Sequence, residues 1–247
     1  MKNAVIFAAG AAIVASSAAF ADVEGIDYVR TWYEADGATV TDDEAAIGFA
    51  VIDLYANFSA PNTDGFDNEA SHMLSAFNFN VALNNTETGL FYQSDLVGSG
   101  ADGAGSWKPS FSFDIPGSAN STVDSFVTIG GGVGALAATN VTTPDPNLGS
   151  ATAADIFNDN VGWFLNPPTS TQGDVIELLV WIGRFTVDGN NARNGANFDF
   201  NGTIGYNYGS GTGSFNADAG GNYQFIPAPG ALALLGMSGL CLRRRRA

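Results

Sequence analysis

The sequence predicts an all-β fold, a single jelly-roll-like β-sandwich, on three observations. Apolar and polar residues alternate through several long stretches, with the period that places side chains on the two faces of a strand. Segments rich in Gly, Asn, Asp and Pro separate these stretches, and the 247 residues include 31 glycines. Helical periodicity is scarce, because only Thr152–Asn160 favours a short helix, with Thr152 as its cap.

Three strands are expected in the first third of the chain. Ile26–Tyr33 carries bulky side chains, and Ala46–Phe58 is typical of one long, half-buried strand. Met73–Leu83 alternates clearly, since its bulky residues fall at every second position.

Four more strands are expected further along. Val123–Gly130 alternates, and Asp174–Val187 is the most continuous apolar run of the body. Ala196–Gly211 alternates Phe with Asp and Asn, and Gly221–Ile226 follows it. Many strands separated by such turns are typical of a sandwich or jelly roll.

The N-terminus has the three parts of a secretory signal peptide. Met1 and Lys2 give a basic start, an Ala-rich apolar run follows, and Ala19–Ala21 forms a small-x-small cleavage site. The sequence therefore predicts that residues 1–21 are removed during export and that the mature chain begins at Asp22.

The C-terminus, residues 227–247, predicts a second processing segment. Gly230–Leu242 holds 13 uncharged residues, about 20 Å as a helix, and Pro227 and Pro229 limit that helix on one side. Four arginines follow the apolar segment: Arg243, Arg244, Arg245 and Arg246. Arginines beside a membrane span reach the interface and stay cytoplasmic, so we expect a short transmembrane segment with the body outside.

This tail resembles the PEP-CTERM sorting signal, in which a proline–x–proline motif precedes a short apolar segment and an arginine cluster. The motif residues here are Pro227, Ala228 and Pro229, with Ala228 where the usual residue is glutamate. The resemblance implies an exosortase, a membrane cysteine protease–transpeptidase, which cuts the tail and releases the body or passes it to the cell envelope. It also implies a bacterium with an outer membrane and an exopolysaccharide-linked export system, and nothing about the activity of the body.

The chain is strongly acidic, with 25 Asp and Glu against 9 Lys and Arg and a formal net charge of −16. Without its two ends the chain keeps four basic residues: Arg30, Lys108, Arg184 and Arg193. Such a polyanion repels nucleic acid and anionic lipid, so we expect no nucleic-acid partner and only transient membrane contact through the tail. The one cysteine, Cys241, lies in the tail, which excludes disulfides and thiolate metal sites from the body.

Few residues suit catalysis, and we expect no enzyme. The one histidine, His72, is expected at the surface where a loop enters a strand, and the chain has no nucleophile-elbow pattern. Gly130–Gly134 lacks the ending of a phosphate loop and is expected to be a flexible loop. Glu177 lies in a predicted strand, where burial would suit it to glycosidase chemistry, but we favour a strand that turns it to solvent.

No cofactor is required, and calcium is the one that the sequence suggests. Calcium takes several oxygen ligands from flexible loops, and two acidic segments offer them without matching the EF-hand pattern. The candidate ligands are Asp64, Asp67, Asn68, Glu69, Asp188, Asn190 and Asn191. Ordinary turns with Asx caps account for the same residues and are favoured.

A carbohydrate-binding surface would need exposed aromatic rings beside amide side chains. Four aromatic residues lie in or near predicted loops: Trp107, Trp163, Tyr206 and Tyr208. Most aromatic side chains of a sandwich belong to the core, which is the favoured interpretation of these four.

We therefore predict an exported cell-surface or extracellular-matrix protein with a body of residues 22–226 and no enzymatic activity. Signal peptidase and an exosortase-like enzyme would be its processing partners, and exopolysaccharide is a further candidate partner. The alternative hypothesis is a calcium-aided carbohydrate-binding module, and a third is a carboxylate-based glycosidase. The sequence indicates neither the ligand nor the oligomeric state.

Overall fold

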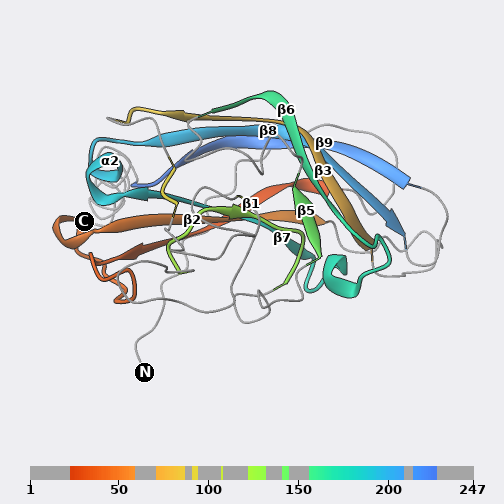
Figure 1. Ribbon diagram of the computed structural model, residues 1–247, viewed down its shortest axis with the longest axis horizontal. Coiled ribbons are helices and arrows are strands. Elements are labelled where there is room, and N and C mark those ends of the chain that lie inside the picture. Colours follow the sequence, from red (N-terminus) through yellow and green to blue (C-terminus); the bar gives the residue numbers. More distant parts are fainter. Residues whose placement is uncertain are drawn as a thin grey trace, which may run out of the picture.

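The computed structural model describes residues 23–58, 71–86, 91–93, 107, 122–131, 141–144, 156–208 and 214–226. These residues form two antiparallel β-sheets packed face to face, with the five-stranded sheet above the four-stranded sheet in Figure 1. The predicted all-β sandwich is confirmed.

Both predicted processing segments, 1–21 and 227–247, lie outside the described residues, so the sorting motif and the arginine cluster stay predictions. Within the described ranges, no helix is long and apolar enough to cross a membrane.

The four-stranded sheet has the strand order β1-β2-β7-β4. Its strands are β1 (Val23–Tyr33), β2 (Phe49–Phe58), β7 (Leu179–Asp188) and β4 (Phe126–Val127). The register of β2 with β7 shifts between Leu54, opposite Gly183, and Tyr55, opposite Trp181. Ile182 is therefore an extra residue of β7 and forms a bulge.

The five-stranded sheet has the order β5-β6-β3-β8-β9. Its strands are β5 (Thr142–Pro144), β6 (Ile156–Leu165), β3 (Ser71–Asn84), β8 (Asn197–Tyr208) and β9 (Ser214–Gln224). The β8–β9 pairing is regular from Asn197 opposite Gln224 to Asn207 opposite Ser214. Three short helical segments complete the described fold: η1 (Glu44–Ala46), η2 (Thr171–Gly173) and α2 (Gly189–Arg193).

The predicted helix over Thr152–Asn160 is wrong in its described part. Residues from Ile156 belong to β6, where Ile156 pairs with Ala82 and Phe157 with Val81 of β3. Local sequence is a weak guide here, because pairing with a long neighbouring strand overrides a short helical preference.

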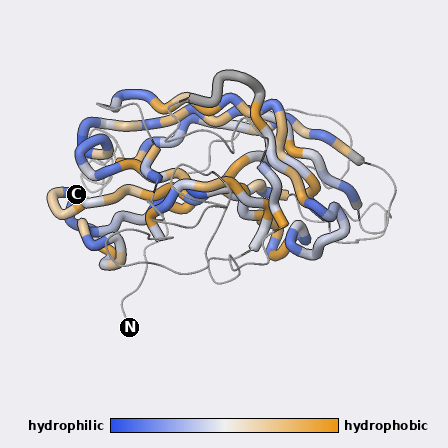
Figure 2. Tube along the Cα trace, viewed as in Figure 1, coloured by the Kyte–Doolittle hydropathy of each residue, from blue (hydrophilic) through white to orange (hydrophobic). Residues whose placement is uncertain are grey.

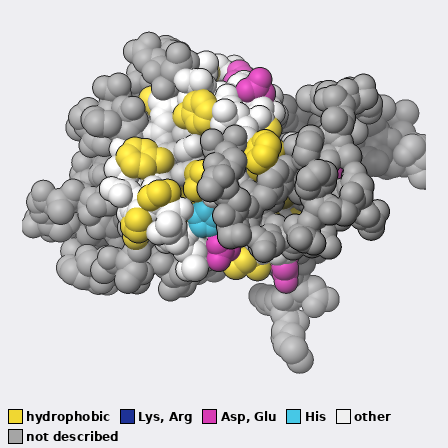
Figure 3. Space-filling view, turned by 90° about the vertical axis from the view of Figure 1, so that its right-hand side faces the viewer, with side chains coloured by type: hydrophobic (Ala, Val, Ile, Leu, Met, Phe, Trp, Pro, Cys, Tyr) yellow, Lys and Arg dark blue, Asp and Glu magenta, His cyan; other side chains and the backbone are white. Residues whose placement is uncertain are grey.

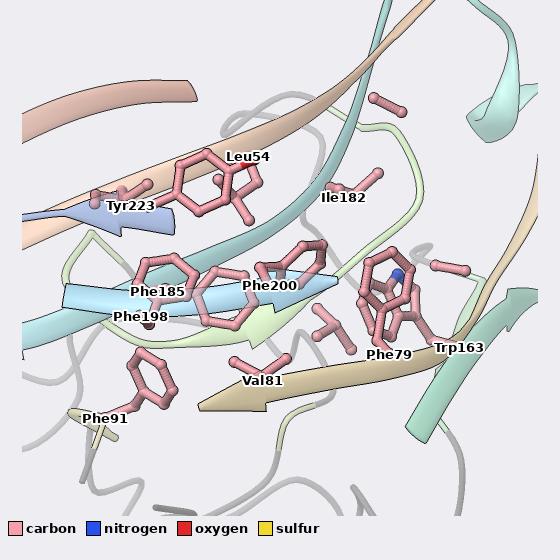
Figure 4. Close-up of a cluster of buried hydrophobic side chains, with 14 of the residues drawn as sticks. Leu54, Phe79, Val81, Phe91, Trp163, Ile182, Phe185, Phe198, Phe200 and Tyr223 are labelled. Atoms are coloured by element: carbon pink, nitrogen blue, oxygen red, sulfur yellow. The ribbon is translucent and has the colours of Figure 1, made fainter. Parts of the chain in front are cut away.

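Aromatic side chains fill the space between the sheets (Figure 4). Phe79 and Trp163 stack with ring centroids 5.4 Å apart, and Phe79 also contacts Phe200 at 4.3 Å. Gly202 of β8 faces this cluster, and a Cβ at Gly202 would overlap the Phe79 ring. Figure 2 shows where hydrophobic and hydrophilic residues lie along the chain. Hydrophobic stretches follow the strands, whereas α2 and its neighbouring turns are hydrophilic.

Edge strands β1 and β9 lie on the same side of the sandwich and are joined by side chains. Trp32 Nε1 donates a hydrogen bond to Phe225 O at 2.9 Å, and Tyr223 Oη donates to Ile26 O at 3.3 Å. These two bonds connect one sheet to the other along this edge of the sandwich. The outer face of each sheet points away from the core.

Candidate functional site

The outer face of the five-stranded sheet is unusually rich in amide and carboxylate side chains. Because neighbouring residues of a strand point to opposite faces, the residues of β3, β8 and β9 that alternate with the core residues share this outer face. We call this outer face the polar face, and its polar side chains include Asn84, Asn197, Asp199, Asn201, Thr203, Asn216, Asp218, Asn222 and Gln224.

One end of the polar face is a hydrogen-bonded network across three strands. Asn222 Nδ2 donates to Asn197 Oδ1 at 3.0 Å and to Asp199 Oδ1 at 2.8 Å. Asn84 Nδ2 donates to Asp199 Oδ2 at 3.1 Å. The Asp199 carboxylate therefore accepts from a neighbour on each side, which orders these side chains on the surface.

The middle of the polar face carries Thr203 opposite Asp218, with Thr203 Oγ1 donating to Asp218 Oδ1 at 2.9 Å. Asp218 is exposed, as are Asn201 on β8 and Asn216 on β9. Hydroxyl, amide and carboxylate groups of this kind both donate to and accept from ligand hydroxyls.

Two phenylalanines interrupt this polar surface. Phe77 of β3 pairs with Thr203, so it lies on the polar face, where it is half-buried. Phe164 of β6 pairs with Ser75 and is 45% exposed. A ring on the outer face of a sandwich does not pack into the core between the sheets, so the half-buried Phe77 and the exposed Phe164 are both candidates for ligand contact.

The described arginine side chains lie elsewhere in the molecule. Arg30 of β1 shares the inner face with Ile52, Arg193 belongs to α2, and Arg184 is buried beside Asp53 on the outer face of the other sheet. The polar face therefore combines neutral amides with Asp199 and Asp218, a charge pattern that disfavours anionic ligands.

The Arg184–Asp53 pair joins β2 and β7 on the outer face of the four-stranded sheet. Arg184 Nε donates to Asp53 Oδ1 at 2.8 Å, and its Nη2 donates to Oδ2 at 2.9 Å. Burial lowers the pKa of Arg184, but the hydrogen bonds and charge of Asp53 outweigh burial and raise it. Burial, followed by the charge of Asp53, raises the pKa of the adjacent Tyr55 to about 12.

His72 is held by acceptors at both ring nitrogens. Its Nδ1 lies 2.8 Å from Asp174 Oδ1, and its Nε2 lies 3.1 Å from Pro168 O. In Figure 3 the histidine side chain, coloured cyan, lies next to an acidic side chain, in agreement with the contact between His72 and Asp174. In a catalytic triad, His Nε2 would bond to the serine nucleophile, but here Nε2 lies beside the carbonyl oxygen of Pro168. The His72–Asp174 pair instead links β3 to the segment before β7.

Glu177 does not lie in a strand, because β7 begins only at Leu179. It occupies a two-residue turn with Leu178, closed by a hydrogen bond of 3.0 Å from Leu179 N to Ile176 O. The Glu177 side chain is exposed, as expected, but the strand expected around it is wrong at this end. The turn residues Glu177 and Leu178 include no glycine, so alternation and apolar content alone do not distinguish this hairpin turn from a strand.

Three of the calcium candidates, Asp188, Asn190 and Asn191, lie at the start of α2 and are hydrogen-bonded there. Asp188 Oδ1 accepts from the N–H groups of Asn190 and Asn191 at 2.8 and 3.0 Å, and Oδ2 accepts from Asn191 Nδ2 at 2.8 Å. Asn190 Oδ1 accepts from Arg193 Nη2 at 2.7 Å.

The other four calcium candidates, Asp64, Asp67, Asn68 and Glu69, lie outside the described residues. Across the described part of the chain, no three His, Cys, Asp or Glu side chains are placed to hold one metal ion. A calcium site stays a prediction for the first acidic loop.

The aromatic candidates from the sequence are core residues where they are described. Trp107, Trp163 and Tyr206 are 0%, 1% and 1% exposed, and the side chain of Tyr208 lies outside the described residues. Phe77 and Phe164 were not among the candidates, because Phe77 shared one alternation with Phe79 and no strand was predicted over Phe164. Pairing across the sheet, which a single sequence does not reveal, decides which face each ring takes.

The start of the glycine-rich segment is anchored. Gly130 N donates to Trp181 O at 2.7 Å, and a Cβ at Gly130 would overlap Gln172 O. Residues 132–134 lie outside the described part. Gly130 thus serves packing beside β7, and the expectation of a flexible loop does not apply to this residue.

Comparison with known proteins found no matching family model, no matching curated protein and no matching solved structure.

Proposed function

We propose that the chain is an exported cell-surface or extracellular-matrix protein without enzymatic activity, whose tail an exosortase-like enzyme processes. The observation that carries the proposal is the presence of a sorting-type segment at each end of a single acidic β-sandwich. The engaged ring nitrogens of His72 and the exposed turn position of Glu177 support the non-enzymatic part.

Terminal masses of the exported protein test this proposal. The full-length chain would be expressed in a bacterium that has an exosortase system, and the surface fraction analysed by mass spectrometry. We expect an N-terminus at Asp22 and loss of the arginine cluster. Glutamine at positions 243–246 should leave the tail uncut, whereas the control Lys108→Gln should be processed normally. A surface protein that keeps residues 1–21 or the arginine cluster would refute the proposal.

The second candidate function is carbohydrate binding, and the ordered amide and carboxylate groups of the polar face favour it. Binding sites for hydroxylated ligands combine a few placed polar groups with aromatic side chains, and this face carries both.

Thermal melting with calcium and with a chelator tests whether calcium contributes. A ligand that binds only the folded state raises its stability. An upward shift would support a cation site in the loop that contains Asp64 and Glu69, and an unchanged melting temperature would remove calcium from the proposal.

The third hypothesis, a glycosidase, depends on Glu177. Activity of the full-length chain on polysaccharide that disappears in Glu177→Gln would support it, and unchanged turnover in that variant would eliminate it.

A further inference from the structure

We propose that the polar face binds a neutral polysaccharide chain across the strands, with Phe77 supporting a sugar ring and Asn216, Thr203 and Asp218 binding its hydroxyls. The inference rests on the second candidate function and assigns it a site and a ligand class.

Phe77 is placed to present its ring because both neighbouring strands carry glycine beside it. A Cβ at Gly205 of β8 would lie 3.4 Å from Phe77 Cε1, and a Cβ at Gly162 of β6 would lie 3.3 Å from Phe77 Cβ. The edge of the ring thus lies beside the Gly205 backbone, next to the small Ser75 side chain, whose Oγ would lie 2.5 Å from the same Cβ. A half-buried ring in this position leaves apolar surface to which the C–H groups of a sugar can pack.

Polar groups border the same spot on the other side. Asn216 Oδ1 lies 3.4 Å from the position of a Cβ at Gly205, the same distance as Phe77 Cε1. One row further along, Phe77, Thr203 and Asp218 follow one another across β3, β8 and β9. Adjacent strands are about 4.8 Å apart, so a sugar ring over Phe77 has hydroxyl-binding groups one and two strands away.

The second ring extends the site beyond a single sugar. Phe164 pairs with Ser75, two residues before Phe77 on β3, which makes the two rings diagonal neighbours on one face. Aromatic groups on β6 and β3, followed by polar groups on β8 and β9, suit a chain that crosses the strands.

Charge selects the ligand class. The described groups of this surface include the carboxylates of Asp199 and Asp218, while Arg30, Arg184 and Arg193 lie on other surfaces or in the interior. Carboxylates accept hydrogen bonds from neutral hydroxyls and repel uronate or sulfate groups, so a neutral chain fits and an anionic chain does not.

Affinity electrophoresis of the full-length chain tests the site. Gels would contain a neutral glucan, a mannan or a galactan, with alginate as the anionic comparison and chelator present throughout. The test variants are Phe77→Leu, which keeps apolar volume without the ring, and Asn216→Ala at an exposed position. The matched control is Asn57→Ala, which removes an amide that donates to Asp27 Oδ2 at 2.9 Å on the opposite outer face.

We expect at least one neutral polysaccharide to retard the wild-type chain, about tenfold weaker binding in both test variants, and wild-type retardation in Asn57→Ala. Unchanged binding in both folded test variants would overturn the site while carbohydrate binding stands. No retardation by any polysaccharide would overturn the candidate function with it. Stronger retardation by alginate would overturn the neutral ligand class.

Discussion

Removal of the Asp53 carboxylate is expected to destabilise the sandwich by about 3–5 kcal/mol, the cost of leaving a buried charge without its partner. The Arg184 side chain is 3% exposed and that of Asp53 is 10% exposed, so water cannot replace the lost acceptor without structural change. Arg184 would keep its hydrogen bond of 3.0 Å to Thr122 O and its positions over Phe126 and Trp181. The Thr122 carbonyl accepts only one N–H of Arg184, and the two aromatic rings attract the guanidinium without carrying a negative charge. The positive charge of Arg184 would therefore lack a counter-charge.

Urea unfolding followed by tryptophan fluorescence would measure this loss in Asp53→Ala. The matched variant is Asp53→Leu with Arg184→Met, which replaces both partners by apolar side chains and should recover most of the stability. A loss below about 1 kcal/mol in Asp53→Ala would refute the claim that the buried carboxylate compensates Arg184.

Three other positions give independent expectations. Gly130→Ala should destabilise the fold more than Gly195→Ala. Both residues have positive φ, 65° and 85°, but only at Gly130 would the new Cβ overlap a backbone carbonyl. Equal losses of stability on chemical denaturation would contradict this. Burial raises the pKa of Tyr55 to about 12 from a reference of 10.0, so the unfolded chain loses its proton first. Stability should be full below about pH 10 and fall toward pH 12, and Tyr55→Phe should flatten that fall in pH-dependent melting; an identical profile would argue against it. Glu177 and Leu178 have φ of 52° and 67° in a two-residue turn of the kind that favours Asn-Gly. Replacing the pair by Glu177→Asn and Leu178→Gly should therefore stabilise the folded state by about 1 kcal/mol. A lower melting temperature would show that the native pair makes contacts that outweigh its strain.

The strand pattern was predictable where alternation is long and undisturbed. Met73–Leu83 and Ala196–Gly211 were expected as strands and form most of β3 and β8, because their bulky residues recur at every second position. Of the expected strand Gly221–Ile226, only Gly221–Gln224 forms the end of β9, which begins at Ser214. The small Ala and Gly residues of β9 give a weak strand signal in the sequence.

The candidate site could not be predicted from the sequence in the same way. The Asn and Asp residues of β8 were visible as the polar half of an alternation, but their partners on β3 and β9 depend on register. Bulges in β3 on either side of Phe77 change which residues share a face, and nothing local marks them. The two proposed sorting segments, by contrast, rest on linear motifs at the termini, so proposing them needs no structure, and they stay predictions.

The most direct test of the account is backbone amide mapping of the full-length chain, by NMR or hydrogen exchange, with the neutral oligosaccharide that binds best. Binding of a neutral chain to the polar face should produce changes concentrated on β3, β8 and β9 around Phe77, Thr203 and Asn216, with the outer face of β1 and β2 unaffected. Changes confined to the four-stranded sheet would contradict it.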